Sequence, residues 1–567
     1  MTPLLCLQHL TYYYPQSTTP SLDDISFEIG PGEFVLLMGA SGSSKTTLLQ
    51  VIAGLLPYSV GGRIKGNVLI EGTDIIRTPQ AKRGVVGLVL QDPESQLVSL
   101  TVEDEIRFGP ENLLLPREEV NTRLEWALDR CRLTEIRNAF VYALSGGQKQ
   151  RIVIAAGLAM KPRLLCLDGP TTNLDPMGTH EVMKVTQELL RDGSVESVII
   201  SSNKVDGLLP YATRIIVIDQ GKVVLDGKPE EVIGQYVKEL QELGLFVPEM
   251  ARLFTEYHFS QNGSRGWLPR TVSDMAALLE TKNLAAPHIA VEPKTPVISI
   301  AALNHVSFGY TPGKKVLRDI SLTIQKGQFL AVVGQNGSGK TTLMNLLAGL
   351  REPQSGSILV DGINVRDLRP GTVGYVFQSP DHQFVDPTSV WNELAFGLKQ
   401  LKYSEEMINQ RVTSVLELFG LQGIKDTIPY DLSMGQKRFL SVATMLVLQP
   451  KILILDEPTT GLDARLTTKL MTILQKLVEE GMTVIQVSHD MEQIAQYCQR
   501  VVVIGSEGNI VFDDTPRTLF ANQPVLQSTM LEAPPASRLA QTLWPNHSPL
   551  PITVEEFQLS GGNHATT

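Results

Sequence analysis

The sequence lacks any apolar run close to the roughly 18 residues that a membrane-spanning helix needs. Its longest apolar segments, such as FVLLMG and RIIVID, are only long enough for buried strands. The first ten residues also lack a basic segment followed by a long apolar one, so we expect no signal peptide. A transport function would therefore need separate membrane subunits.

Cysteine is scarce, and basic residues are not in excess. Four cysteines, at positions 6, 131, 166 and 498, are scattered with no paired spacing. This argues against a disulfide framework or a zinc site and fits a reducing compartment, so we expect the cysteines to serve packing. Lysine and arginine number 49 against 60 aspartates and glutamates, a formal net charge of −11. That balance argues against a general nucleic-acid binder, which usually shows a basic excess.

What the sequence does contain is an internal duplication. GQNGSGKTTLMNLLAGL, from Gly334, repeats GASGSSKTTLLQVIAGL, from Gly39, after 295 residues. Gln378 follows Gln91 after 287 residues, and LSMGQKR follows LSGGQKQR after 288. Nearly constant offsets over the whole chain indicate two homologous halves.

The duplication divides a chain of 567 residues that is too long for one hydrophobic core. We predict a first domain over residues 1–282, a linker over 283–297 and a second domain over 298–567. Each half ends in a small appendage, because VPEMARLF…LPRTV is repeated as APPASRLA…LPITV. The linker segment is rich in proline and alanine and lacks periodicity, which is typical of an extended connection.

The order of elements within each half predicts an α/β fold. FLAVVG and ILILD are short continuous apolar runs, as buried parallel strands tend to be. TTLMNLLAGL follows the first of them with apolar residues at helical spacing. We therefore expect helices packed on a mostly parallel sheet.

The second half carries a complete pair of phosphate-binding motifs. Residues 334–341, GQNGSGKT, match G-x-x-x-x-G-K-[ST] between a strand and a helix, where backbone N–H groups can surround phosphate oxygens. Lys340 should reach the β- and γ-phosphates, and Thr341 should bind Mg²⁺. Asp456 ends an apolar strand and can hold the metal, and Glu457 can orient or deprotonate the attacking water.

Together with these motifs, LSGGQ at residues 144–148 resembles the signature of ABC-type ATPases. TTNLD, TTGLD and VSHD extend the resemblance over both halves. It implies tandem P-loop NTPase domains, each with a helical subdomain, and it implies that Tyr14 and Tyr310 stack on adenine. In this family two domains pair head to tail, with each ATP between the Walker motifs of one domain and the signature of the other. His489, with Glu457 and Gln378, then belongs to the catalytic group.

The resemblance assigns the remaining binding residues. In the first half, the nucleotide-binding residues are Tyr14, Gly39, Ala40, Ser41, Gly42, Ser43, Ser44, Lys45, Thr46, Thr47, Ser145, Gly146, Gly147 and Gln148. In the second half, they are Tyr310, Gly334, Gln335, Asn336, Gly337, Ser338, Gly339, Lys340, Thr341, Thr342, Ser433 and Gly435. The expected Mg²⁺ ligands are Thr46, Gln91 and Asp168 in one half and Thr341, Gln378 and Asp456 in the other.

The first half departs from the family pattern in its Walker motifs. Ser44 replaces a glycine, Gly169 stands where the second half has Glu457, and Asn203 stands where it has His489. A positioned general base is worth about 10² to 10⁴ in rate, and glycine has no side chain to replace it. Ser44 could also crowd the loop or disfavour a positive φ.

In the second half only the signature departs, because Met434 interrupts LSMGQ. Head-to-tail pairing would place all four departures in one composite site and leave the other complete. We hypothesise that the degenerate site binds nucleotide and holds the halves together, while the complete site hydrolyses ATP.

A further segment narrows the type of ABC ATPase. QDPESQL and QSPDHQF follow Gln91 and Gln378 and resemble the ATPases of energy-coupling factor (ECF) importers. In that family the segment forms an additional helix near the groove that receives the membrane coupling protein, and Gln96 and Gln383 match its second glutamine. The resemblance implies an importer of a vitamin or metal ion at the cytoplasmic face of a bacterial membrane. Its partners would be a coupling membrane protein and a small substrate-binding membrane protein.

Two alternatives remain open at this point. A soluble tandem ABC protein acting on ribosomes or nucleic acid would usually have a basic surface and often a long charged helical linker, and this chain has neither feature. A conventional ABC importer ATPase shares the chemistry but does not predict the glutamine-containing segments. We expect no nucleic-acid partner.

Overall fold

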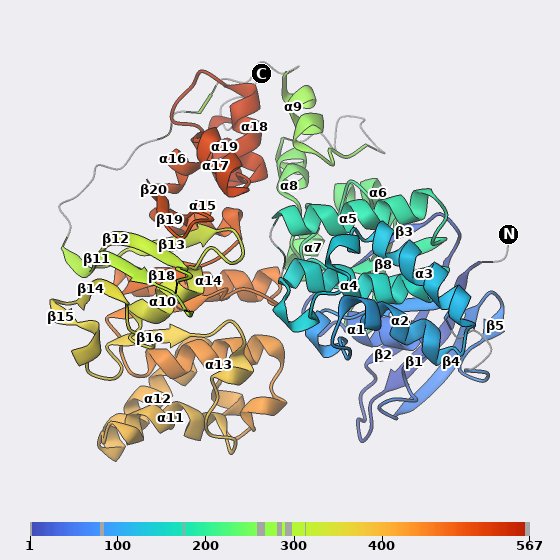
Figure 1. Cartoon of the computed structure of the whole chain (residues 1–567), viewed down its shortest axis with the longest axis horizontal. Helices are drawn as coiled ribbons and strands as arrows, with labels where there is room; N and C mark the ends of the chain where they lie inside the picture. Colours follow the sequence, from blue (N-terminus) through green and yellow to red (C-terminus); the bar gives the residue numbers. More distant parts are fainter. Residues whose placement is uncertain are drawn as a thin grey trace. The chain divides into compact units, whose positions relative to one another are not determined.

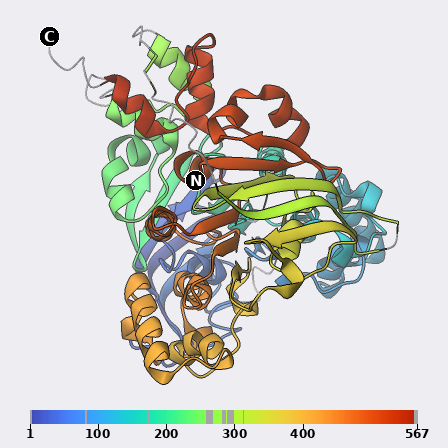
Figure 2. The ribbon, with the colours of Figure 1, turned by 90° about the vertical axis from the view of Figure 1, so that its left-hand side faces the viewer.

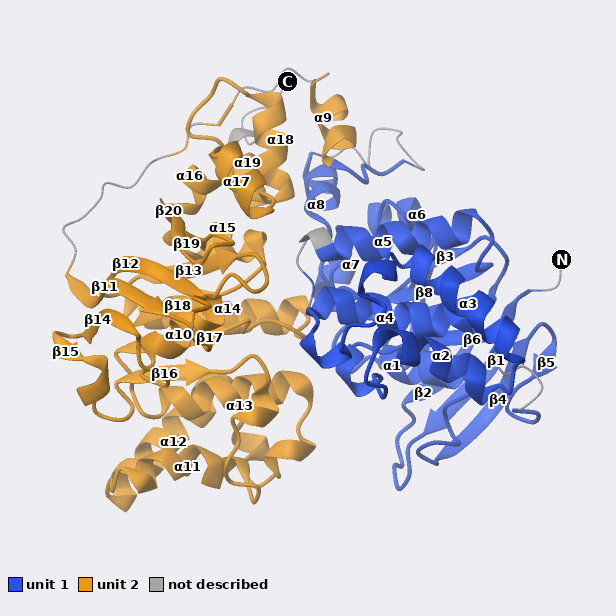
Figure 3. Cartoon of the chain, viewed as in Figure 1, with its two compact units in different colours: residues 1–271 blue, residues 272–567 orange. Residues whose placement is uncertain are grey.

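The computed structural model describes residues 3–561 except 80–83, 173, 175, 258–266, 281–285, 288, 290–297 and 312. The chain divides into two compact units, residues 1–271 and 272–567 (Figure 3). The predicted linker lies mostly outside the described residues. Helix α9, Val272–Glu280, belongs to the second unit, where it packs against α18, Pro535–Leu543. All four cysteines are free and buried.

Each unit contains a six-stranded sheet made mostly of parallel strands, as the apolar runs predict. In the first unit the strand order is β10-β9-β3-β8-β7-β6, and in the second it is β16-β17-β18-β13-β19-β20 (Figure 1). All neighbours pair in parallel except the antiparallel edge strands β10 and β20. The strands of the first sheet are β3 Phe34–Met38, β6 Val86–Val89, β7 Leu164–Asp168, β8 Ser197–Ser201, β9 Arg214–Asp219 and β10 Lys222–Gly227. Those of the second are β13 Phe329–Gly334, β16 Val373–Val376, β17 Ile452–Asp456, β18 Thr483–Val487, β19 Arg500–Ile504 and β20 Ile510–Asp514.

Each unit also contains a four-stranded antiparallel sheet that the sequence analysis did not predict. Its strand order is β2-β1-β4-β5 in the first unit and β12-β11-β14-β15 in the second. The strands are β1 Leu5–Tyr13, β2 Leu22–Ile29, β4 Arg63–Ile70 and β5 Thr73–Asp74, and then β11 Ser299–Phe308, β12 Leu317–Gln325, β14 Ser355–Val360 and β15 Ile363–Asn364. Strands β2 and β12 alternate buried and exposed residues, as strands with one solvated face do.

Helices complete each unit and include the predicted helical subdomain. In the second unit this subdomain contains α11, Val390–Gln400, and α12, Glu405–Phe419. Figure 2 shows these helices, in orange, grouped apart from the strands of that unit. The helices of the first unit are α1 Lys45–Ile52, α2 Val102–Asn112, α3 Arg117–Arg130, α4 Gly146–Ala159, α5 Pro176–Arg191, α6 Pro229–Gln235, α7 Val237–Glu242 and α8 Glu249–Glu256. The remaining helices of the second are α10 Lys340–Leu347, α11 Val390–Gln400, α12 Glu405–Phe419, α13 Met434–Leu446, α14 Ala464–Glu479, α15 Met491–Tyr497, α16 Pro516–Ala521, α17 Gln523–Thr529 and α19 Val554–Gly561.

The phosphate loops join the central strand of each sheet to the first helix of the core. Loop 334–339 connects β13, whose six residues are all buried, to α10. Gly339 has φ 102° at the start of α10, a conformation that glycine adopts without a steric penalty. The fold therefore presents backbone N–H groups at a helix N-terminus, where they favour an anion.

Candidate nucleotide-binding and hydrolysis site

In the second unit, the phosphate loop and the end of strand β17 bring the predicted lysine, threonine and aspartate together. Lys340 Nζ donates to the carbonyls of Gly334 and Gln335, at 2.8 Å each. Thr341 Oγ1 donates to Asp456 Oδ2 at 2.9 Å. Oxygen ligands of this kind suit Mg²⁺, which in nucleotide sites is bound by one or two protein ligands and substrate phosphates.

Asp456 has a second support that the sequence analysis missed. Tyr375, on β16, donates its hydroxyl to Asp456 Oδ2 at 3.2 Å. Burial raises the pKa of Asp456, and the hydrogen bonds from Thr341 and Tyr375 oppose that rise. The aspartate is thus held by two neutral hydroxyls. Because they do not neutralise its negative charge, that charge is available to a metal ion.

Glu457 has the environment of a general base. It follows β17 with φ 48°, and burial together with the neighbouring Asp456 raises its pKa to about 8. His489 Nε2 lies 3.5 Å from Glu457 Oε1. Oε1 is buried and accepts no hydrogen bond from the described part of the chain. A base with a pKa near the working pH combines basicity with a useful deprotonated fraction.

The first unit keeps the nucleotide-binding half of this arrangement. Lys45 Nζ donates to the carbonyls of Gly39 and Ala40, at 2.6 and 3.1 Å. Thr46 Oγ1 donates to Asp168 Oδ2 at 2.5 Å. The second hydroxyl on this aspartate comes from Ser201 on β8 instead of a tyrosine on β6. Oxygen ligands for Mg²⁺ are therefore present here as well.

The catalytic half of the arrangement is missing from the first unit. Gly169 has φ 53°, close to the value of Glu457, so the backbone turn is the same and only the carboxylate is lost. A Cβ on Gly169 would lie 2.9 Å from Thr172 Oγ1 and 3.2 Å from Gln91 Cγ, so neighbouring side chains occupy the space next to it. Asn203, in place of a histidine, is half-buried.

Ser44 is accommodated by a compensating residue. It has φ 77°, and its hydroxyl shares a 2.9 Å hydrogen bond with that of Ser21. In the second unit a Cβ on Gly339 would lie 2.7 Å from Leu317 Cδ2 and 3.3 Å from Val316 Cγ1. The serine therefore bonds to a small polar neighbour where the second unit has an apolar one, although the positive φ remains unfavourable for it.

We expect Ser44→Gly to raise the free energy of unfolding of the first unit by about 1 kcal/mol. Glycine adopts the left-handed conformation without the penalty of about 1 to 2 kcal/mol that an L-residue has there. The loss of the hydrogen bond to Ser21 offsets part of this gain. Gly339→Ser is the matched change and should destabilise the second unit, because of the contact with Leu317. Thermal unfolding of the full chain measures both. A lower free energy of unfolding for Ser44→Gly, or an unchanged or higher one for Gly339→Ser, would contradict this account of the loop.

The two tyrosines assigned to adenine lie beside the phosphate-loop helices. Tyr14 shares a 3.0 Å hydrogen bond with Thr47, and Tyr310 shares a 3.1 Å hydrogen bond with Thr342. The Tyr310 side chain is largely exposed, with the guanidinium carbon of Arg351 5.8 Å from its ring centroid. An exposed ring fixed at the helix start is suited to stacking on a base.

The signatures form the N-termini of α4 and α13. Ser145 and Ser433 cap these helices, each in a capping box with the glutamine three residues later, Gln148 or Gln436. A Cβ on Gly146 would meet no heavy atom within 4 Å, whereas the Met434 side chain at the same position of the second unit is half exposed. The first signature thus presents an open backbone, and the second presents a side chain beside its serine.

The glutamines of the ECF-like segments point inward. Gln96 and Gln383 follow short 3₁₀ helices, Pro93–Ser95 and Pro380–His382. Gln96 Oε1 accepts from the Leu90 N–H at 2.7 Å, and Gln383 Oε1 accepts from the Phe377 N–H at 3.2 Å. These side chains fix the shape of the segment, so any role in partner coupling would be indirect.

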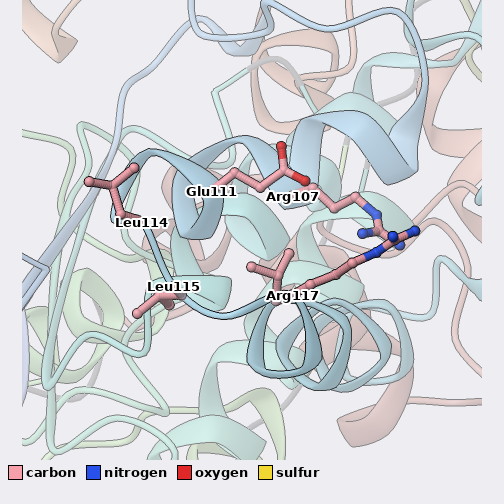
Figure 4. Close-up of a pocket in the computed structure, with 6 residues that line it drawn as sticks. Arg107, Glu111, Leu114, Leu115 and Arg117 are labelled. Atoms are coloured by element: carbon pink, nitrogen blue, oxygen red, sulfur yellow. The ribbon is translucent and has the colours of Figure 1, made fainter.

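An open pocket of about 470 Å³ lies in the helical subdomain of the first unit (Figure 4). In the view of Figure 4, the side chains of Arg107 on α2 and Arg117 on α3 extend towards the same side, while Leu114 points away from them. The pocket is lined by Arg107, Glu111, Leu114, Leu115, Arg117 and Val120. None of these residues belongs to the phosphate loop, so the pocket is separate from the chemistry.

The described residues lack two kinds of feature. No helix in that part of the chain is long and apolar enough to cross a membrane. No group of three His, Cys, Asp or Glu side chains there could hold a metal ion by itself. The Mg²⁺ expected in these sites would therefore depend on the threonine, the aspartate and the nucleotide phosphates together.

Comparison with known proteins places these sites in a family. The ABC transporter family model matches residues 22–172 and 317–460. A Methanosarcina mazei protein provisionally named ABC transporter ATP-binding protein is 37% identical, over 98% of this chain and 96% of its own length. A Bacillus subtilis protein provisionally named HMP/thiamine import ATP-binding protein YkoD is 36% identical, over 94% of this chain and 95% of its own length.

A solved structure also matches. The protein cbiO1 of Clostridium perfringens, described as part of the ABC transporter complex cbiONQ, is 34% identical with a TM-score of 0.38. The match covers 42% of this chain and 98% of that one. The two family matches and the near full-length relatives agree with the duplicated phosphate loops and signatures. The chain belongs to the ABC transporter ATP-binding proteins, as an ATPase with two ABC domains in one polypeptide.

Proposed function

We propose that this ATPase energises a membrane importer of the ECF type, for a vitamin or a metal ion, with one catalytic and one degenerate composite site. The two halves pair head to tail within one chain, so that the intact Walker motifs of the second half meet the intact LSGGQ of the first. The degenerate site joins the Walker motifs that contain Ser44 and Gly169 to the signature that contains Met434.

The residues then divide the work between the two sites. At the complete site Lys340 binds phosphate oxygens, Glu457 takes the proton of the attacking water, and His489 lies beside that carboxylate. Mg²⁺, held by Thr341, Gln378 and Asp456, would supply positive charge for the phosphates. At the degenerate site Lys45, Thr46, Gln91 and Asp168 bind Mg-ATP, and hydrolysis is slow because no base is present.

The observation that carries the transport proposal is an exposed apolar patch at the same place in both units. In the first unit the patch consists of Val98, Leu100, Phe140 and Tyr142, and in the second of Val385, Ile428 and Tyr430. Phe140 and Tyr142 stack with ring centroids 5.5 Å apart, and the Val141 N–H donates to the Leu100 carbonyl at 3.0 Å. Exposed apolar patches of this kind are typical of interaction sites.

The position of the patch favours a coupling partner. In each unit it adjoins the segment that follows Gln91 or Gln378, so a helix bound there would lie next to the loop that carries a nucleotide-site residue. Binding of ATP would shift the pair of halves towards a closed state, and hydrolysis with product release would return it to the open state. The partner is an integral membrane protein, and the ATPase binds it at the cytoplasmic face of the membrane.

A paired substitution tests this proposal. We expect the double change Tyr142→Glu and Tyr430→Glu to abolish co-purification of integral membrane proteins from native membranes in mild detergent. The ATPase activity of the isolated chain should stay at the wild-type level, because neither tyrosine belongs to a phosphate loop, a strand end or a signature. Thermal unfolding controls for the loss of the hydrogen bond from Tyr430 to the Phe384 carbonyl. Val224→Glu, at an exposed apolar residue on β10, is the matched control and should leave assembly intact.

Two outcomes would contradict the proposal. Unchanged membrane assembly in the double variant would show that the patches do not receive the partner. Recovery of the wild-type chain with ribosomes or nucleic acid, and with no integral membrane protein, would favour the soluble tandem ATPase instead. A small, very hydrophobic protein recovered with its ligand would identify the substrate.

A further inference from the structure

In the second unit, a buried arginine joins the signature helix to the loop of Gln378. Arg438 lies in α13, five residues after Ser433, and its exposed fraction is 2%. Its Nη1 donates to the Phe377 carbonyl at 2.9 Å, and its Nη2 donates to the Gln378 carbonyl at 2.6 Å. One guanidinium thus binds two successive carbonyls of the loop.

This arginine has no carboxylate within ion-pair distance among the described residues, although Asp456 and Glu457 act on it electrostatically. Burial lowers the pKa of Arg438 to about 10, and the two carboxylates oppose that decrease. The side chain therefore stays charged at neutral pH. A buried cation is unfavourable unless it is well paired, so the bonds to the loop carbonyls compensate for its burial.

Two further contacts join the same helix and loop. Gln383 Nε2 donates to the Ser441 carbonyl at 2.6 Å and to Thr444 Oγ1 at 2.7 Å. Lys437 Nζ lies 2.8 Å from Asp381 Oδ1. The loop from 377 to 383 is therefore attached to α13 at both ends.

The first unit has only part of this connection. Lys149, next to the first signature, pairs with Glu94, which matches the pair of Lys437 with Asp381. Gln150 occupies the position of Arg438, and its buried Nε2 has no hydrogen-bond partner among the described residues. Gln96 donates to the Leu88 carbonyl at 3.4 Å and, within the described part of the chain, makes no hydrogen bond to α4. The additional connection therefore lies in the unit that has the complete Walker motifs.

We propose that Arg438 is a positioning residue that transmits the position of α13 to Gln378, so that nucleotide at the degenerate site controls the complete site. This inference rests on the proposed head-to-tail pairing, in which Ser433 at the start of α13 faces the nucleotide of the degenerate site. The helix is rigid over the short distance from Ser433 to Arg438, and the arginine binds the loop directly. Since Gln150 makes no such contact, transmission runs from the degenerate site to the complete one.

ATP turnover of the full chain tests the role of Arg438. We expect Arg438→Gln, which copies the first unit, to lower kcat by about tenfold to 10²-fold with little change in KM, because a misplaced catalytic loop affects chemistry more than binding. Arg438→Lys keeps the charge and most of the stem but has only one nitrogen, so it should restore part of the rate. Gln150→Leu is the matched control and should leave kcat unchanged. Wild-type kcat in Arg438→Gln would overturn the proposal.

A double-mutant cycle with Lys45→Ala tests the transmission itself. If Arg438 carries the signal, emptying the degenerate site should lower kcat in the wild type and lower it much less in Arg438→Gln or Arg438→Lys. Additive effects would overturn the transmission, since they would mean that the degenerate site acts by another route. Thermal unfolding identifies any variant that fails to fold, and in that case the lysine variant alone decides the cycle.

The underlying pairing can be tested separately in the same assay. If Ser145→Ala lowers kcat at the second Walker site, the head-to-tail arrangement holds, and an additive cycle then contradicts only the role of Arg438. If Ser145→Ala leaves kcat unchanged, the pairing itself is wrong. The two failures are therefore distinguishable.

Discussion

Replacing Glu457 with glutamine is expected to lower the ATP turnover of the full chain by about 10² to 10⁴, the range that a positioned general base contributes. The substitution keeps the size of the side chain and removes the only carboxylate at this position in either half, because the first half has Gly169. Turnover is measured as phosphate release at saturating Mg-ATP. Retention of half the wild-type rate would rule out the one-site mechanism, since it would mean that the first site hydrolyses ATP as well.

The reverse substitution supplies the control. Gly169→Glu restores the carboxylate in the first half but should not restore a second active site. Thr172 Oγ1 and Gln91 Cγ would lie 2.9 and 3.2 Å from the new Cβ, and Asn203 stands where the complete site has His489. If Gly169→Glu doubled the turnover, the loss of the carboxylate alone would explain the asymmetry.

The sequence was sufficient to predict the parts of the site that are contiguous in the chain. The phosphate loops and the buried strands that end in Asp168 and Asp456 are each encoded in one short segment. Their local geometry follows from glycine conformation and apolar periodicity, which are properties of neighbouring positions.

The parts that could not be predicted depend on which strands and helices become neighbours. Asp456 accepts a hydroxyl from Tyr375 on β16, whereas Asp168 accepts one from Ser201 on β8. The two residues are not at matching positions of the duplicated sequence, so comparison of the halves could not reveal the exchange. The inward bonds of Gln383 are likewise tertiary contacts with α13.

The second large effect is expected from Gly146→Met, which copies the second signature into the first. Under the proposed pairing, the backbone N–H groups of the first signature meet the γ-phosphate at the complete site. A methionine side chain there should keep those donors from the phosphate and lower kcat by about 10² to 10³, as loss of a transition-state donor does. Because a Cβ on Gly146 would have no neighbour within 4 Å, the variant should fold normally.

Met434→Gly is the matched change at the same position of the second signature. It should alter turnover little, because the composite site that it repairs still lacks the carboxylate at position 169. The pair of variants distinguishes the two ways of joining Walker motifs and signatures. If each signature instead served the Walker motifs of its own half, Met434→Gly would increase turnover and Gly146→Met would leave it unchanged, because the only general base lies in the second half. A large loss confined to Gly146→Met therefore requires that the two halves exchange signatures, which places hydrolysis at a site that neither half can form alone.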